Sequence, residues 1–236
     1  MDSTFRSLDA AVADIRGCMA RAARAAGRQP EDVLLCAACK TRTCETVRES
    51  AALPIDLFGE NHMQELLLHG DAGAYLGKPV HFIGHLQTNK VRKVVGRAAM
   101  IQSVDNLRLL EAIEQEALRQ GLTQEILLEI NLAGEPGKSG ISPEALPALL
   151  EAACACGHVR VRGLMAIPPA GETGDAVRRR FAHLRRLLEQ SRARLPALPL
   201  DTLSMGMSGS FEEAILEGAT IVRIGTAIYG PRPSHR

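Results

Sequence analysis

A lysine with reactive potential, Lys40, ends the short apolar stretch "LLCAACK" at residues 34–40. Buried strands seldom carry an ammonium group for packing reasons. A lysine amine can attack an aldehyde and form a Schiff base with it. Lys40 is therefore either a surface residue just past a strand end or a nucleophile at the mouth of a site.

Two glycine-containing turns near the C-terminus have the composition of a phosphate site. "MGMSGSFEEA" contains Ser208 and Gly209, and "RIGTA" contains Gly225 and Thr226. Glycine lets a phosphate approach the backbone closely, and a helix N-terminus offers free N–H groups. Ser208 could also simply cap the helix that follows it. The two turns together favour a phosphate site.

Arg223 stands in the middle of an apolar strand, "TIVRIG". A buried guanidinium must find a partner, which could be a structural ion pair or a ligand atom. An amine at Lys40, a phosphate site and a deep donor together fit a phosphorylated aldehyde that carries a ring nitrogen. Pyridoxal 5'-phosphate has all three features. The phosphorylated aldehyde of a Schiff-base aldolase would need the lysine and the phosphate site but not Arg223.

The elements that must position these residues alternate along the chain. An amphipathic pattern at 4–26 predicts an N-terminal helix, and each strand but the last is followed by a helical pattern. The predicted strands are 32–40, 55–61, 80–85, 100–105, 125–133, 159–167, 200–207 and 220–230. Strands that are apolar on both faces are typical of parallel sheets covered on both sides.

Eight such units predict an α/β fold, a single (β/α)8 barrel of the TIM type with an extra N-terminal helix. An open doubly wound sheet is the alternative, but no G-x-G-x-x-G turn follows the first strand. We expect one domain over 1–236, with the N-terminal helix in 1–30 and the barrel in 32–230.

Closure of a barrel would gather the residues that follow its strands at one rim, where such folds have their active sites. The polar residues at these predicted strand ends are Lys40, Asn61, His85, Asp105 and Asn131. Each alone could be ordinary loop polarity, and Asp105 could be a helix cap. As a set they indicate a polar site, and Asn61 is a candidate cofactor-binding residue.

Composition limits the possible partners. The chain has 28 basic and 27 acidic residues, so no net field favours nucleic acid or an anionic membrane. No apolar run approaches the roughly 18 residues of a membrane span, and the first residues do not resemble a signal peptide. We therefore expect a cytoplasmic protein.

The sequence predicts no metal site. Cys36 and Cys39 form a C-x-x-C, but residues three apart on a strand point to opposite faces. His81 and His85 share a strand face without a carboxylate or cysteine at fitting spacing. The roles of these histidines stay open.

A second possible ligand site, "GEPGKSG", has glycine spacing that does not match a P-loop. The loop could instead close over the barrel mouth, and Lys138 in it could carry a ligand transiently. The role of Lys138 also stays open.

The chain resembles the pyridoxal phosphate homeostasis protein family, which is related to the barrel domain of alanine racemase. The matching stretches are "CKTRT", "FGENHMQE", "HFIGHLQTNK", "SVDNL", "EINLAGEPGKSGI", "RGLMAIPP" and "LSMGMSGSFEEAILEGATIVRIGTAIYG". The resemblance implies a single barrel with pyridoxal 5'-phosphate as a Schiff base on Lys40. It also implies Arg223 at the pyridine nitrogen and phosphate contacts from Ser208, Gly209, Gly225 and Thr226.

The same resemblance implies a protein that takes part in intracellular cofactor homeostasis with little or no turnover. A racemase would need a second base, and neither Tyr75 nor Tyr229 is a convincing one. A pyridoxal phosphate-dependent racemase or related enzyme remains the alternative. We expect a monomer whose partners are the cofactor and, as recipients, apo-enzymes that depend on it.

Overall fold

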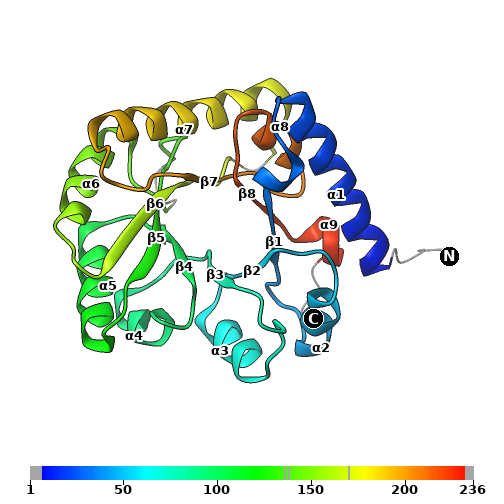
Figure 1. The fold of residues 1–236 in the computed structure, drawn as a ribbon, viewed down its shortest axis with the longest axis horizontal. Helices are drawn as coiled ribbons and strands as arrows, with labels where there is room; N and C mark the ends of the chain where they lie inside the picture. Colours follow the sequence, from blue (N-terminus) through cyan, green and yellow to red (C-terminus); the bar gives the residue numbers. More distant parts are fainter. Residues whose placement is uncertain (1–6, 136, 138, 170, 232–236) are drawn as a thin grey trace.

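A computed structural model describes residues 7–135, 137, 139–169 and 171–231. Eight parallel strands, β1 to β8, pair in sequence order and close into a barrel, with β8 hydrogen-bonded to β1 (Figure 1). The strands are β1 (Leu34–Ala38), β2 (Leu57–Glu60), β3 (Val80–Phe82), β4 (Met100–Val104), β5 (Gln124–Glu129), β6 (Val159–Met165), β7 (Thr202–Ser204) and β8 (Ile221–Ile224). The predicted (β/α)8 barrel is confirmed.

Helices follow the strands and form the outer layer of the barrel (Figure 1). The α-helices are α1 (Leu8–Ala25), α2 (Cys44–Ala51), α3 (Met63–Asp71), α4 (Val91–Val94), α5 (Leu107–Gln120), α6 (Leu146–Cys154), α7 (Gly174–Arg194), α8 (Phe211–Leu216) and α9 (Thr226–Tyr229). Three short 3-10 helices lie at Pro30–Asp32, Thr88–Lys90 and Pro143–Ala145. Helix α9 was not predicted from the sequence, because one helical turn leaves too little periodicity to detect.

The strands bury both faces, which is why their sequences are continuously apolar. Cys36 packs inside the barrel with Leu57 and Ile221. Cys39 belongs to the outer core, between the sheet and the helices. The two thiols therefore lie on opposite faces, as the strand geometry predicted.

The N-terminal helix α1 packs beside α8 and α9 on the outside of the barrel (Figure 1). Ser7 caps it by accepting a hydrogen bond from the N–H of Ala10, and Val12, Ile15 and Met19 form its buried stripe. The helix begins later than the predicted residue 4, and residues 1–6 lie outside the described chain. It therefore covers the part of the barrel from which the two glycine-containing turns emerge.

Most predicted strands extended too far, because apolar loop residues at the barrel ends continue the strand pattern. β1 ends at Ala38, so Lys40 lies in the turn after the strand rather than in the strand.

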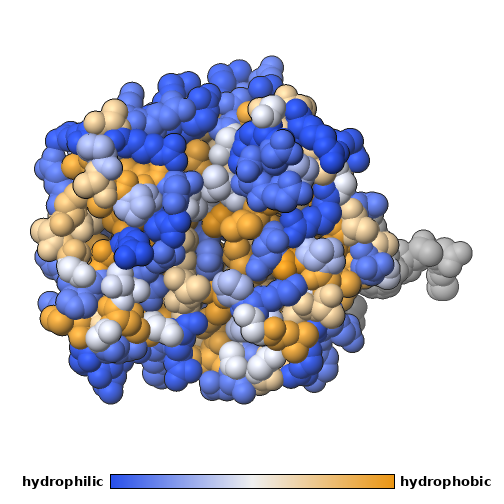
Figure 2. Space-filling view, in the orientation of Figure 1, coloured by the Kyte–Doolittle hydropathy of each residue, from blue (hydrophilic) through white to orange (hydrophobic). Residues whose placement is uncertain are grey.

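On the outer surface, hydrophilic residues cover much of the helices and hydrophobic ones show between them (Figure 2). None of the helices within the described residues combines the length and apolar character needed to span a bilayer.

Candidate functional site

A cavity of about 350 Å³ opens at the C-terminal ends of the strands. Its lining includes every residue that the sequence analysis assigned to cofactor binding. The lining residues are Ala38, Lys40, Arg42, Asn61, Ile83, Ile167, Met207, Ser208, Gly209, Arg223, Gly225 and Thr226. Loops after β1, β2, β3, β6, β7 and β8 contribute to it, so the site exists only once the barrel has closed.

Lys40 is partly exposed in the turn that joins β1 to α2. No described residue accepts a hydrogen bond from its amine or pairs with it, and Lys40 lines the cavity. The next residue, Thr41, has a φ of 63°, a left-handed conformation that β-branched residues seldom adopt. Lys40 therefore follows a regular strand and precedes a strained backbone unit.

The two predicted phosphate turns are joined to each other by a hydrogen bond. Ser208 Oγ accepts it from the N–H of Ala227, at 3.2 Å, so Ser208 does not cap its own helix. Gly209 is exposed, and a Cβ on it would meet no heavy atom within 4 Å. Gly225 is tighter, because its Cβ would lie 3.2 Å from the carbonyl oxygen of Ala38.

Arg223 lies inside the barrel and is only 4% exposed. It donates to Ser204 Oγ at 2.5 Å and to the carbonyl oxygen of Ala166 at 2.9 Å. Within the described chain it forms no ion pair with a carboxylate, which removes the structural ion pair from the two alternatives. Burial lowers its pKa from the ordinary value, and nearby Cys36 and Glu129 oppose that effect. These two bonds use two of the five N–H donors of the guanidinium, and Arg223 also lines the cavity.

A chain of hydrogen bonds continues from Arg223 across the barrel interior. Ser204 donates to Gln102 Oε1 at 2.6 Å, and the Gln102 amide donates to His81 Nδ1 at 2.8 Å. Burial lowers the pKa of His81 to about 4, so its ring is neutral at neutral pH. His81 is thus a hydrogen-bonded barrel residue, while His85 is exposed at the rim.

Asn61 follows β2 directly and lines the cavity. The end of β3 approaches it so closely that a Cβ on Gly84 would lie 2.1 Å from the Asn61 carbonyl oxygen. Only glycine fits this contact. The close approach fixes the position of Asn61 at the rim.

The other polar strand-end residues take up loop contacts. Asp105 accepts from the N–H of Gly140, and Asn131 donates to the carbonyl oxygen of Glu135. Asn106 rather than Asp105 caps α5, because its side chain accepts from the N–H of Leu109. Lys138 lies outside the described residues.

Part of the site was not predicted from the sequence. Arg42 also lines the cavity. Its position two residues after Lys40 was the sequence signal that could have identified it. A second cavity of about 130 Å³ adjoins the first through Ile167 and is lined by Glu129. Burial and the charge of Asp105 raise the pKa of Glu129 to about 7. The apolar lining residues carry no distinguishing sequence signal.

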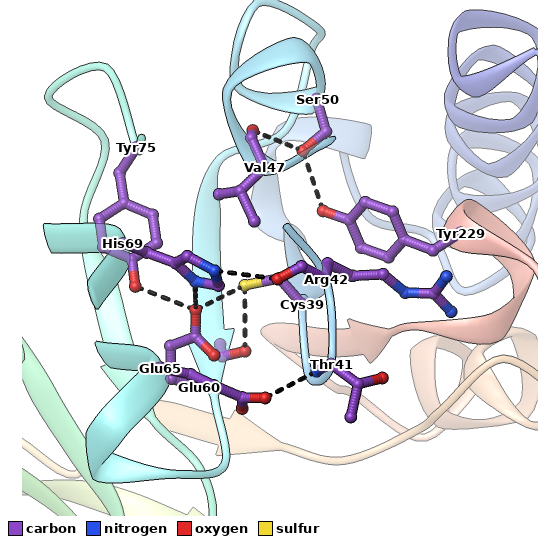
Figure 3. Close-up of polar contacts among 11 residues, drawn as sticks. Cys39, Thr41, Arg42, Val47, Ser50, Glu60, Glu65, His69, Tyr75 and Tyr229 are labelled. Carbon is purple, nitrogen blue, oxygen red and sulfur yellow. Dashed lines mark hydrogen bonds and ion pairs between the residues drawn. The ribbon is translucent and has the colours of Figure 1, made fainter. Parts of the chain in front are cut away.

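A buried cluster behind the Lys40 turn was also missed. Cys39, Glu60 and His69 place their polar atoms within 4.8 Å of one another, and Tyr75 joins them (Figure 3). These residue types can ligate a metal, but the contacts of 2.7 to 3.0 Å with Glu60 Oε1 have hydrogen-bond lengths. The sequence does contain a signal for this cluster, because Glu60 is a carboxylate within the apolar predicted strand "IDLFGEN".

Comparison with known proteins gives consistent matches over nearly the whole chain. The sequence profile of the alanine racemase N-terminal domain matches residues 16–233. The pyridoxal phosphate homeostasis proteins of Aquifex aeolicus and Pseudomonas aeruginosa are each 42% identical to this chain. They cover 90% and 94% of this chain, and 92% and 94% of their own lengths.

Solved structures agree with the sequence matches. PipY of Synechococcus elongatus, solved with pyridoxal phosphate bound, is 33% identical with a TM-score of 0.81. The match covers 90% of this chain and all of PipY. Alanine racemase of Corynebacterium glutamicum, at 19% identity and a TM-score of 0.72, shares the fold over 96% of this chain and 62% of its own. The chain therefore belongs to the pyridoxal phosphate homeostasis protein family.

Proposed function

We propose that this protein binds pyridoxal 5'-phosphate as a Schiff base on Lys40 and takes part in cofactor homeostasis with little or no turnover. The observation that carries the proposal is that one cavity is lined by Lys40, Arg223 and both glycine-containing turns. Family membership and the cofactor in the PipY structure support it.

The residues present fit this cofactor. A free amine suits an aldehyde, and the exposed Gly209 leaves open space for a phosphate to approach the backbone. The phosphate would also contact Ser208, Gly225 and Thr226. Asn61 would bind the cofactor from the rim of the same cavity. The cavity volume of about 350 Å³ is in the range of small-molecule sites.

Each side chain would have a defined part. The Lys40 amine would condense with the aldehyde of the cofactor and release one water molecule. Arg223 is held by Ser204 and Ala166 and would donate to the ring nitrogen. When bound, the cofactor acts as an electron sink that depends on protonation of that nitrogen. A guanidinium beside the nitrogen disfavours its protonation and so weakens the sink.

The positions of the tyrosines support low turnover. This sequence has two tyrosines, and neither lines the cavity. Tyr75 is buried in the outer core and donates to Glu60, while Tyr229 is bonded to Ser50. A racemase needs a second base on the other face of the substrate from the lysine, and neither phenol is available for that role.

The remaining parts of the proposal concern organisation. We propose that residues 1–236 act as one domain, that the protein is a monomer, and that apo-enzymes receive the cofactor from it. The cavity lies at an open rim of the barrel, which suits exchange with solvent and delivery to another protein.

The test is the visible spectrum of the protein with added pyridoxal 5'-phosphate, before and after borohydride, followed by peptide mapping. We expect an absorption band that is lost on reduction and a label on Lys40. Lys40→Ala should abolish the band, whereas Lys93→Ala, at an exposed position on α4, should keep it.

A label spread over surface lysines would contradict the site. Turnover is tested on the same loaded protein, with alanine in deuterated water. We expect no enzyme-level exchange of the α-proton. Rapid deuterium incorporation would instead support the racemase alternative.

A further inference from the structure

We propose that Glu60 and His69 form a buried charged pair that holds the turn carrying Lys40 in its binding conformation. The inference rests on the proposed attachment of the cofactor at Lys40. Both side chains of the pair are fully buried, at 0% exposure, on the opposite side of the β1 segment from the barrel interior. They are positioning residues, because neither lines the cavity.

The pair is hydrogen-bonded to Cys39 and Arg42 (Figure 3), which precede and follow Lys40 in the chain. Before the lysine, Cys39 Sγ donates to Glu60 Oε1 at 3.0 Å. After it, the carbonyl oxygen of Arg42 accepts from His69 Nε2 at 3.0 Å. Because Glu60 ends β2 and His69 belongs to α3, the turn is tied to two elements that do not contain it.

Hydrogen-bond roles determine where the protons are. A backbone carbonyl can only accept, so His69 Nε2 carries a proton. Cys39, Tyr75 and His69 all approach the same oxygen, Glu60 Oε1, at 3.0, 3.0 and 2.7 Å. Cys39 and Tyr75 can only donate to this oxygen, and two such donors favour an ionised carboxylate. We therefore assign the proton of the third contact to His69 Nδ1, which makes the ring an imidazolium.

The pKa directions agree with this assignment. Burial raises the pKa of Cys39 and of Tyr75, so both keep their protons and donate. Burial lowers the pKa of His69. This effect of burial is outweighed by the hydrogen bond and charge of Glu60, by the Arg42 carbonyl and by the charge of Glu65. The pKa of His69 is therefore raised overall.

The turn needs such a restraint because its backbone is strained. Thr41, next to Lys40, holds a φ of 63°, and such conformations persist only where surrounding contacts enforce them. The Thr41 N–H donates to Glu65 Oε1 at 2.9 Å, from the same helix as His69. Without the pair, the turn can relax and the Lys40 amine loses its fixed place at the cavity.

The experiment compares His69→Phe and Glu60→Gln with a matched pair elsewhere. His158 and Glu114 also form a histidine–glutamate contact, at 3.2 Å, but before β6 at the far end of the barrel. The controls are therefore His158→Phe and Glu114→Gln. For each protein we would measure amide hydrogen exchange at residues 40–42 and the affinity for pyridoxal 5'-phosphate.

We expect exchange at residues 40–42 to rise at least about tenfold in both test variants, and affinity to fall at least about tenfold. The controls should match wild type at these residues. In wild type, the His69 ring signal should titrate above the ordinary histidine pKa, and Glu60→Gln should lower its midpoint by about one unit or more. This titration tests the charged pair itself, and the exchange and affinity measurements test its effect on the turn.

Unchanged exchange at residues 40–42 in a folded test variant would overturn the proposal, as would a His69 ring that titrates at or below the ordinary histidine pKa. If His69→Phe does not fold, Cys39→Ala removes one donor at small volume cost and gives the same comparison. Failure of the proposed function can be distinguished from failure of this inference. Wild type would then not react at Lys40, while exchange and titration would still report on the charged pair.

Discussion

At the scale of single residues, the barrel interior contains a hydrogen-bond chain that explains how it tolerates a guanidinium. Arg223, Ser204, Gln102 and His81 link β8, β7, β4 and β3 in one line. Each partner satisfies a group that would otherwise be buried without one. The neutral ring of His81 ends the chain without bringing in a second charge.

The lowered pKa of His81 gives a pH prediction. Its folded value of about 4 lies below the ordinary value of about 6.5, so the unfolded chain binds the proton more readily between these values. The contribution of His81 to stability is therefore complete above pH 6.5 and falls as the pH drops toward 4. Between pH 6.5 and 5 the loss is about 2 kcal/mol, at ~1.4 kcal/mol per unit.

Urea unfolding of wild type and His81→Gln at several pH values checks this. The glutamine can still accept from Gln102 but does not titrate, so its stability should fall less between pH 6.5 and 5. His69, whose pKa is raised, acts in the opposite direction: its contribution is complete below about pH 6.5 and lost as the pH rises through its folded value. Identical acid slopes for the two proteins would show that His81 is not the titrating group.

At the scale of elements, a bulge in β6 sets how the sixth strand meets its neighbours. The β5–β6 register shifts between Ile126 and Leu127, which pair with Val161 and Gly163. The extra residue, Arg162, turns outward and pairs with Asp201 at 2.6 Å. The bulge brings Gly163 so close to β7 that a Cβ there would lie 1.9 Å from the carbonyl oxygen of Thr202.

Gly163→Ala should therefore destabilise the protein by about 3 kcal/mol, because the clash is with backbone that cannot move without breaking the β6–β7 ladder. Gly157→Ala is the control, since its nearest heavy atom would be 3.8 Å away. We expect that substitution to change stability by less than about 1 kcal/mol. Equal urea midpoints for the two variants would mean that the strands separate easily at the bulge.

At the scale of the whole molecule, α1 packs beside the units that carry the phosphate turns. It lies against α8 and α9, which follow β7 and β8. Met19 is 2% exposed and belongs to the same hydrophobic core as Ala214 of α8 and Ile228 of α9. Helix and barrel therefore share one hydrophobic core, which supports the proposal of a single domain.

Met19→Ala should lower stability by about 2 to 5 kcal/mol and keep one unfolding transition. The transition followed by far-UV circular dichroism should coincide with loss of the bound cofactor signal. Arg24→Ala, at an exposed position of the same helix, should leave the midpoint nearly unchanged. A separate early transition in Met19→Ala would show that α1 is an independent unit.

Local pattern and residue type were enough to predict most of the architecture. Short apolar runs, period-3.6 patterns and chain order predicted eight strands alternating with helices. The barrel then placed Lys40 and Asn61 at one rim, with Arg223 deeper in a strand. These predictions succeed because each depends on a residue and its near neighbours, together with the rule that parallel strands end on the same side. Strand lengths were less accurate, because apolar loop residues continue the pattern.

Only the tertiary structure decided which polar groups meet. Ser204 and Gln102 are 102 residues apart in sequence, and their hydrogen bond follows from barrel closure. Glu60 and His69 belong to different elements, and their contact with the Lys40 turn depends on how α3 packs against α2, β2 and β3. A hydrogen bond requires atoms within about 3 Å, and only the closed barrel brings side chains from distant segments to that distance.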